Sequence, residues 1–318
     1  MEPEAAESSS AHVGRPAPQG ASAAGAEQSC PECAARGARP AQPAPEQFAY
    51  VLGRLDVRFP SLGIEREYQQ RERVIADLPR EPRNARVRAV LEKNPHLATR
   101  VGWILSVGGS PTFALNAASS GLKDSFFSAL SQADQPEHFC VVIGRVGPFV
   151  NPASYGGLLI PLLMVDQMYV GSLVAWTGGL AAVAKTALKG RKIGEERFQA
   201  AARELFRNVT GMPDNMGVSD GHRALNYLLV QHPGMFLAAA EREDQLLDRI
   251  ETRVQLSAGG RRHVVVILVF VDRATGVAER VFCSVDVTEE WPFVLGGDGA
   301  ASPLGFAPFL ENGFYAAS

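Results

Sequence analysis

Residues 263–271 read HVVVILVFV, an unbroken apolar run that decides the fold of the C-terminal part of this chain. A short run rich in β-branched residues is typical of a central strand that is buried on both faces. Residues 250–256 and 278–287, on either side of it, alternate apolar and polar residues as half-buried strands do. Residues 272–276 form a tight turn between the last two strands, so the sequence predicts an antiparallel β-meander over residues 250–287.

Helical patterns precede this meander. Residues 194–209 repeat apolar residues near helical spacing, which indicates one buried face. Residues 219–230 form a similar pattern, and Ser219 and Asp220 can accept hydrogen bonds from the free amides of its first turn. The sequence therefore predicts a capped helix that begins at Ser219.

The apolar stretch between the two halves predicts one or two buried helices over residues 168–188, with Gly178-Gly179 as a break. Residues 168–184 are uncharged, but this length is at the lower limit for crossing a bilayer, and the stretch contains several glycines. We therefore expect no membrane span.

The N-terminal half of the folded region alternates strand and helix patterns. The expected strands and helices are a strand at 48–53, helices at 64–78 and 85–93, a hairpin of 101–107 with 112–116, a helix at 122–130, and strands at 139–146 and 158–165 with a break at Pro161. Together these patterns predict an α+β fold with antiparallel sheets and packed helices.

The two ends of the chain differ in composition from the part between them. Residues 1–46 are mostly Ala, Pro, Gly, Ser and Glu, with Val13 as the single large aliphatic residue. Such a segment buries too little apolar area to offset the entropy of ordering, so we predict a disordered tail. We expect one α+β domain over residues 47–295, followed by a Gly- and Phe-rich tail of irregular structure over residues 296–318.

Charge and the N-terminal residues restrict the class of protein. A formal net charge of −3 gives no electrostatic reason to expect a nucleic-acid partner. The opening Met-Glu-Pro-Glu is acidic, whereas a signal peptide needs a basic segment followed by an apolar run. We therefore predict a cytoplasmic protein whose cysteines are thiols or metal ligands rather than disulfides.

The Cys30-Pro-Glu-Cys33 motif is the sharpest chemical feature. Two thiolates at this spacing can bind one tetrahedral Zn²⁺, which needs two further ligands. Cys140 and Cys283 are candidates, and a second copy of the chain could instead supply its own Cys30 and Cys33 in a homodimer. The alternatives are a flexible tail with two free cysteines and, less in keeping with the surrounding pattern, redox chemistry.

Catalytic motifs are not apparent in the sequence. Residues 179–186 approach a phosphate-binding loop, but Ala184 stands where the pattern requires glycine. Asp220, His222 and Arg223 form a polar group at a helix start, which helix capping explains and which a catalytic site would also fit.

A mixed-charge patch follows the first strand and has two interpretations. Its members are Arg54, Arg58, Glu65, Arg66 and Glu67. They could form the rim of a peptide-binding site, or they could be the solvated face of a helix.

Several segments, in order, resemble one known family. These segments are FAYVLG at 48–53 with the charged helix after it, VGWIL at 101–105 with PTFAL at 111–115, GVSDGHRALNY at 217–227, and VFVD at 269–272 with VFCSVDV at 281–287. Over about residues 48–295 they resemble the C-terminal domain of unknown function of the cyanobactin maturation proteins PatA and PatG. Those proteins carry a subtilisin-like protease as well, and because no protease triad pattern is visible here, the chain resembles a free-standing version of the domain.

This resemblance implies a part in the maturation of ribosomally synthesised, post-translationally modified peptides. We expect an accessory, non-catalytic domain that binds a precursor peptide or the pathway's enzymes, and exposed strand edges in the meander could take up an extended peptide. The alternatives are an unrecognised peptide-modifying enzyme that uses residues such as Asp220, His222 and Arg223, and a structural zinc-linked dimer. No catalytic residue can be named from the sequence.

Overall fold

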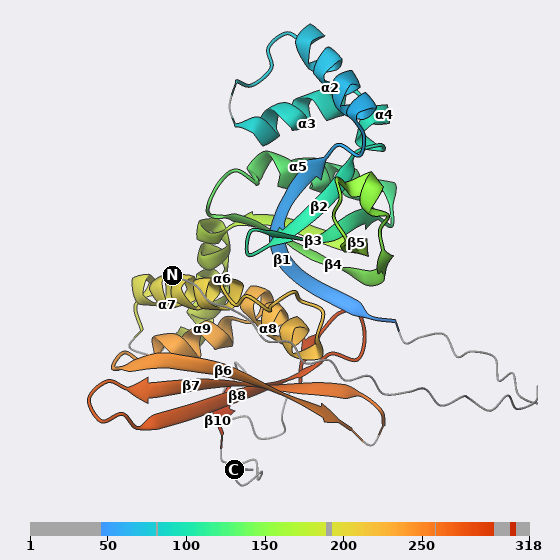
Figure 1. The fold of residues 1–318 in the computed structure, drawn as a ribbon. Helices are drawn as coiled ribbons and strands as arrows, with labels where there is room; N and C mark the ends of the chain where they lie inside the picture. The colour runs from blue at the N-terminus through green and yellow to red at the C-terminus, as the bar shows by residue number, and fades with distance from the viewer. Residues whose placement is uncertain (1–45, 81, 189–192, 258, 296–305, 310–318) are drawn as a thin grey trace, which may run out of the picture. The chain divides into compact units, whose positions relative to one another are not determined.

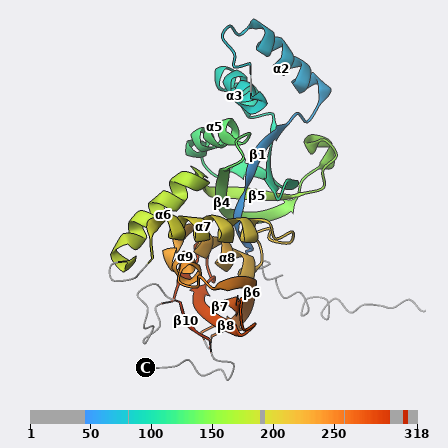
Figure 2. The ribbon, with the colours of Figure 1, turned by 90° about the vertical axis from the view of Figure 1, so that its left-hand side faces the viewer.

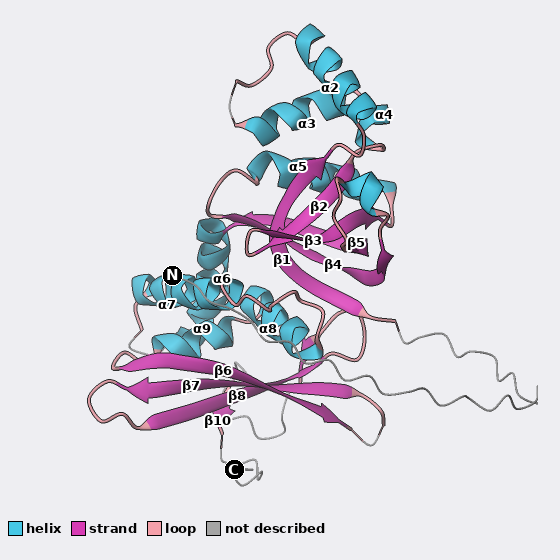
Figure 3. Cartoon of the chain, in the orientation of Figure 1, coloured by secondary structure: helices cyan, strands magenta, loops and turns pink. Residues whose placement is uncertain are grey.

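Strands and helices are both abundant in the structure, a computed structural model that describes residues 46–80, 82–188, 193–257, 259–295 and 306–309. Two mainly antiparallel sheets and their helices form it, so the predicted α+β class is confirmed (Figure 3). The predicted N-terminal tail with Cys30 and Cys33 lies outside the described residues, as does most of the predicted C-terminal tail.

The first sheet closes into a barrel. Its strands are β1 (Phe48–Arg58), β2 (Gly102–Val107), β3 (Ser110–Ala117), β4 (His138–Phe149) and β5 (Pro161–Ser172), in the spatial order β1-β2-β3-β5-β4. The first half of β1 pairs with β4 and the second half pairs with β2, which is how the barrel closes. Gly53 lies at this change of partner, where a Cβ would come 2.6 Å from the Ser106 carbonyl oxygen.

Four helices lie beside the barrel (Figure 1). They are α2 (Leu62–Val74), α3 (Arg83–Lys93), α4 (Pro95–Ala98) and α5 (Lys123–Gln132). Buried side chains such as Val57, Leu91 and Phe126 form one core with the strands. Ser61 caps α2 by accepting from the Ile64 amide at 3.3 Å. We expected α2 to continue to Leu78, but it ends at Val74 because the chain turns extended at Ile75 and reaches a positive φ at Asp77.

The apolar stretch after residue 160 corrects one prediction. Residues Met168–Ser172 are strand, not helix, because they pair with β4 from Val142 to His138. The predicted break of β5 at Pro161 is instead its first residue, a position where proline costs no ladder hydrogen bond. Helix α6 (Leu173–Leu188) then runs without a break through Gly178 and Gly179.

Among the described residues no helix is long and apolar enough to cross a membrane.

The second sheet carries the C-terminal meander, which is confirmed. Its strands are β6 (Gln245–Leu256), β7 (Arg262–Asp272), β8 (Ala278–Asp286) and β10 (Ala307–Pro308), in the order β6-β7-β8-β10, with β9 (Phe293–Val294) also paired to β8. Strand β10 lies where irregular structure was expected, because the edge of β8 that β7 leaves free offers backbone groups to both short strands.

Helices α7 (Glu195–Thr210), α8 (Asp220–Gln231) and α9 (Pro233–Ala240) cover one face of this sheet (Figures 1 and 2). Their apolar faces meet β7 and β8 in a core that also includes Tyr50 and Ile143 of the barrel. The predicted buried face of α7 is confirmed through Phe198, Ala202 and Leu205. This shared core brings the helices against the end of the barrel.

Candidate functional site

The segment GVSDGHRALN, residues 217–226, joins α8 to the first barrel strand. The Tyr50 amide donates to the Gly217 carbonyl at 2.8 Å, and the Asn226 side-chain amide donates to the Tyr50 carbonyl at 2.8 Å. Gly217 has a φ of 70°, and a Cβ there would lie 2.3 Å from the Tyr50 carbonyl oxygen. Gly217 and Asn226 therefore hold β1 close to α8.

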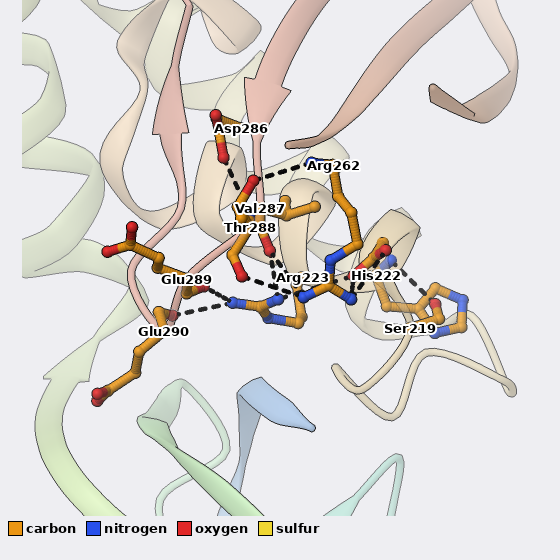
Figure 4. Close-up of polar contacts among 10 residues, drawn as sticks. Ser219, His222, Arg223, Arg262, Asp286, Val287, Thr288, Glu289 and Glu290 are labelled. Carbon is orange, nitrogen blue, oxygen red and sulfur yellow. Dashed lines mark hydrogen bonds and ion pairs between the residues drawn. The ribbon is translucent and has the colours of Figure 1, made fainter. Parts of the chain in front are cut away.

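Arg223, in the same segment, binds the chain that leaves β8. Its side chain is 1% exposed and donates to the carbonyls of Val287 (2.8 Å), Glu290 (3.1 Å) and Glu289 (Figure 4). Burial lowers the pKa of Arg223 to about 10, and the Asp220 carboxylate opposes this effect. These bonds hold the Arg223 guanidinium against the chain that follows β8. Because three carbonyls already accept from it, this guanidinium is not available to bind a substrate.

Asp220 and His222 have different partners. Asp220 accepts from Arg262 at 3.1 Å and lies 3.7 Å from Arg223. The His222 amide donates to the Ser219 hydroxyl at 3.2 Å, which confirms the predicted helix cap. The His222 ring lies 3.9 Å from Asp214, and burial lowers its pKa while Asp214 opposes this. The structure thus brings Asp220 and Arg223 together and directs His222 elsewhere.

The residues of the expected mixed-charge patch interact with different parts of the chain. Arg54 donates to the Pro136 carbonyl, whereas Arg58 lies 3.7 Å from Asp56. On α2, Glu67 pairs with Arg100 at 2.9 Å and with His96 at 3.0 Å. Only Arg54 of this patch contributes to the cavity described below.

The cysteines that the structure describes are core residues. Cys140 and Cys283 are 2% and 1% exposed, and burial raises the pKa of each thiol to about 12. Cys140 also donates to the Gly53 carbonyl at 3.2 Å. Across the described ranges no group of three or more His, Cys, Asp and Glu side chains is placed to hold a metal ion. Zinc at Cys30 and Cys33 stays a prediction, because both lie outside these ranges.

A cavity of about 530 Å³ lies between the end of the barrel and helices α6 and α7. Its apolar lining comes from Leu52, Phe139, Leu173 and Phe206. The rings of Phe139 and Phe206 pack with their centroids 4.8 Å apart, so part of this lining is aromatic. A volume of this size is in the range of small-ligand and side-chain pockets.

Polar and charged groups surround this apolar lining. Arg54 and Arg207 are exposed cations, Glu137 is an exposed anion, and His138 is partly buried. The His138 Nδ1 atom is buried and has no hydrogen-bond partner among the residues that the structure describes. The exposed charges, and not this buried atom, are therefore the polar groups that a ligand in the cavity would contact.

A second, smaller cavity of about 230 Å³ lies between α7, α9 and the start of β6. Two of its arginines are already engaged, since Arg197 pairs with Glu243, and Arg242 pairs with Glu279 at 2.5 Å. The larger cavity is therefore the stronger candidate site.

Sequence reasoning missed the larger cavity. Its lining comes from segments around residues 52–54, 106–109, 136–139, 173 and 206–210. Of these, residues 52–54 belong to the segment FAYVLG and to the mixed-charge patch, but neither pattern indicated a cavity. A further signal is the pair of glycines 108 and 109, which have positive φ in the turn of the predicted hairpin and line the cavity.

Two comparisons with known proteins identify relatives of this chain. Residues 192–298, which span α7 to β9, match the family model "PatG C-terminal". A solved structure, described as "PatG Domain of Unknown Function", superposes with a TM-score of 0.57 at 20% identity and covers 79% of this chain and 97% of that one. No curated protein matched the sequence. The predicted resemblance is thereby confirmed: the chain is similar in sequence to the PatG C-terminal family over residues 192–298, and it has the fold of a PatG-like domain.

Proposed function

We propose that this chain is an accessory, non-catalytic domain in the maturation of ribosomally synthesised, post-translationally modified peptides, and that it binds a precursor peptide at the larger cavity. The similarity to the PatG domain supports the pathway. The cavity carries the proposal of peptide binding, because it combines an aromatic lining with charged side chains around it.

The chemistry of the cavity favours an apolar side chain next to an acidic one. Phe139 and Phe206 provide a surface for an aromatic or aliphatic group, whose burial is favourable at about 25 cal/mol per Å². Arg54 and Arg207 can then pair with a neighbouring carboxylate of the peptide, and guanidinium groups suit carboxylates through their paired N–H donors.

The polar residues of segment 217–226 support an accessory role rather than catalysis. Arg223 and Asn226 both donate to backbone carbonyls, and Asp220 is paired with Arg262. Side chains engaged in this way stabilise the domain, which accounts for their presence without a reaction.

Fluorescence anisotropy with two labelled peptides tests the proposal. One peptide carries a phenylalanine flanked by glutamates, and the other carries the same phenylalanine flanked by lysines. We expect the acidic peptide to bind with a Kd below about 100 μM, which corresponds to about −5.5 kcal/mol, and the basic peptide to bind more weakly.

Two variants and a matched control locate the site. Arg207→Glu should weaken binding about tenfold by reversing a charge at the mouth, and Ser106→Phe should block it by filling the cavity. Arg66→Glu makes the same charge change on the exposed face of α2 and should leave the Kd unchanged. An equal loss in the control, or no binding of either peptide at 100 μM, would contradict the proposal.

Mass spectrometry of precursor peptides encoded beside this gene separates the accessory role from catalysis. Binding without a change in mass supports an accessory domain. A change in mass that is lost in His222→Ala would make the chain an enzyme and overturn the non-catalytic part of the proposal.

A further inference from the structure

Strand β6 forms one edge of the second sheet. It pairs with β7 on one side, and no strand of the described residues pairs with its other side. Near the end of β6, Val254 is 54% exposed and Leu256 is 73% exposed. A long edge strand with exposed apolar side chains is a template for pairing with another strand.

The two faces of β6 differ in chemistry. Ile250 packs on the core beneath the helices, and Thr252 faces Gly221 of α8. The opposite face carries charges, where Glu251 accepts from Arg249 at 2.9 Å and from Arg253 at 3.3 Å. Any strand that pairs with β6 must match both an apolar face and a row of alternating charges.

Another β6 strand meets both requirements in one register. We propose that β6 pairs antiparallel with β6 of a second copy of this chain, with Thr252 opposite Thr252 at a two-fold axis. This register places Glu251 opposite Arg253 of the second copy, and symmetry repeats the pair. On the helix side it places Ile250 opposite Val254, which buries apolar surface that is exposed in the single chain.

Registers centred nearer the start of β6 match less well. Centring the pair on Glu251 puts Glu251 opposite Glu251 and Arg249 opposite Arg253, which is repulsive. Centring it on Ile250 draws in the β-bulge between Leu247 and Arg249, where the strand is irregular. The register centred on Thr252 uses the regular part of β6 beyond this bulge. The charged side chains of β6 therefore favour pairing with a second copy of this chain, in addition to disfavouring other strands.

Disulfide trapping in the full chain tests the register. The chain carries Cys30→Ser and Cys33→Ser, so that the cysteines of the tail cannot cross-link. Thr252→Cys should form a covalent dimer under mild oxidation, since directly opposite residues of an antiparallel pair lie within disulfide reach. Val254→Cys is the matched control, because its two copies would be about 13 Å apart along the strands. Cross-linking of Val254→Cys but not of Thr252→Cys would overturn the register.

Sedimentation equilibrium with a charge swap tests the interface. We expect a dimer whose Kd rises about tenfold in Glu251→Arg and in Arg253→Glu, because each change sets like charges opposite one another twice. The double variant Glu251→Arg/Arg253→Glu restores both pairs and should recover the Kd, with thermal unfolding as a check on the fold. A monomer at 100 μM, or a dimer that the single changes leave intact, would overturn the proposal.

The dimer does not depend on the proposed peptide site, because β6 contributes nothing to the larger cavity. The peptide titration and the sedimentation experiment can therefore fail separately. A monomer whose β6 edge is occupied by the peptide would also overturn the dimer.

Discussion

The Asn226 side-chain amide donates a hydrogen bond to the Tyr50 carbonyl at 2.8 Å. This bond joins α8 to the first barrel strand, although the two residues are 176 positions apart in the sequence. Asn226 is 1% exposed and Tyr50 is fully buried. A buried polar contact of this kind is costly to break, because neither group can turn to water instead.

Replacing Asn226 with alanine should therefore destabilise the protein. We expect a loss of about 1–3 kcal/mol in the free energy of unfolding, the cost of leaving a buried polar group unpaired. Urea denaturation measures it, and Asn208→Ala on the exposed side of α7 serves as the matched control. Equal effects in both variants would show that the contact contributes little.

Gly217→Ala should cost more than an alanine at a glycine of similar backbone conformation. Gly217 and Gly109 both have positive φ, at 70° and 85°, but only at Gly217 would a Cβ collide with the Tyr50 carbonyl, whereas Gly109 has open space. We expect about 1 kcal/mol of backbone strain in Gly109→Ala and clearly more in Gly217→Ala. The two melting temperatures compare them directly, and similar values would argue against the close approach.

Arg223→Met should destabilise the end of the sheet by about 2–4 kcal/mol, because three backbone carbonyls each lose one donor while the aliphatic volume is kept. Arg223→Lys should recover only part of this, since one ammonium cannot reproduce the spread of a guanidinium. The same substitution at exposed Arg66 is the control, and chemical denaturation is the measurement. Full recovery with lysine would mean that charge alone matters here.

The Asp286 carboxylate should make the free energy of unfolding depend on pH in the acid range. Burial by itself would raise the pKa of Asp286, but hydrogen bonds from Arg261 and Thr288 outweigh it and hold the pKa at about 2. Because the folded pKa is lower than the ordinary value of 3.8, the contribution is present above about pH 4 and is lost as the pH falls toward 2. Asp286→Asn should lower stability near neutral pH and converge with the wild type near pH 2. If the free energies of unfolding of the variant and the wild type differed by the same amount at every pH, the low pKa of Asp286 would be contradicted.

Cys140 and Cys283 should resist alkylation in the native protein, since burial raises the pKa of each thiol to about 12. We expect a Cys30→Ser/Cys33→Ser chain to react with iodoacetamide at pH 8 only after unfolding. Mass spectrometry counts the labelled sites. Rapid labelling of either residue in the folded chain would show that its strand opens locally.

Some elements followed directly from the local sequence, and others did not. The apolar run at 263–271 and the cap at Ser219 are read from neighbouring residues, and both were confirmed. Residues 168–172 were wrongly predicted as helix, because an apolar run of this kind suits either state and only pairing with β4 settles it. The candidate site was not predictable, since only the tertiary structure brings residues 52–54 next to residues 136–139 and 206–210.

By itself, the sequence determined the α+β class, the meander over residues 250–287, the capped helix and the resemblance to the PatG domain, because periodicity, turn residues and short motifs are local properties. Only the tertiary structure decided that β1 divides its pairing between β2 and β4 to close a barrel, and that Arg223 and Asn226 bind backbone carbonyls. It also assembled the cavity around Phe139 and Phe206. These features depend on which distant segments meet, and that is set by the burial of the whole core rather than by any one stretch of the chain.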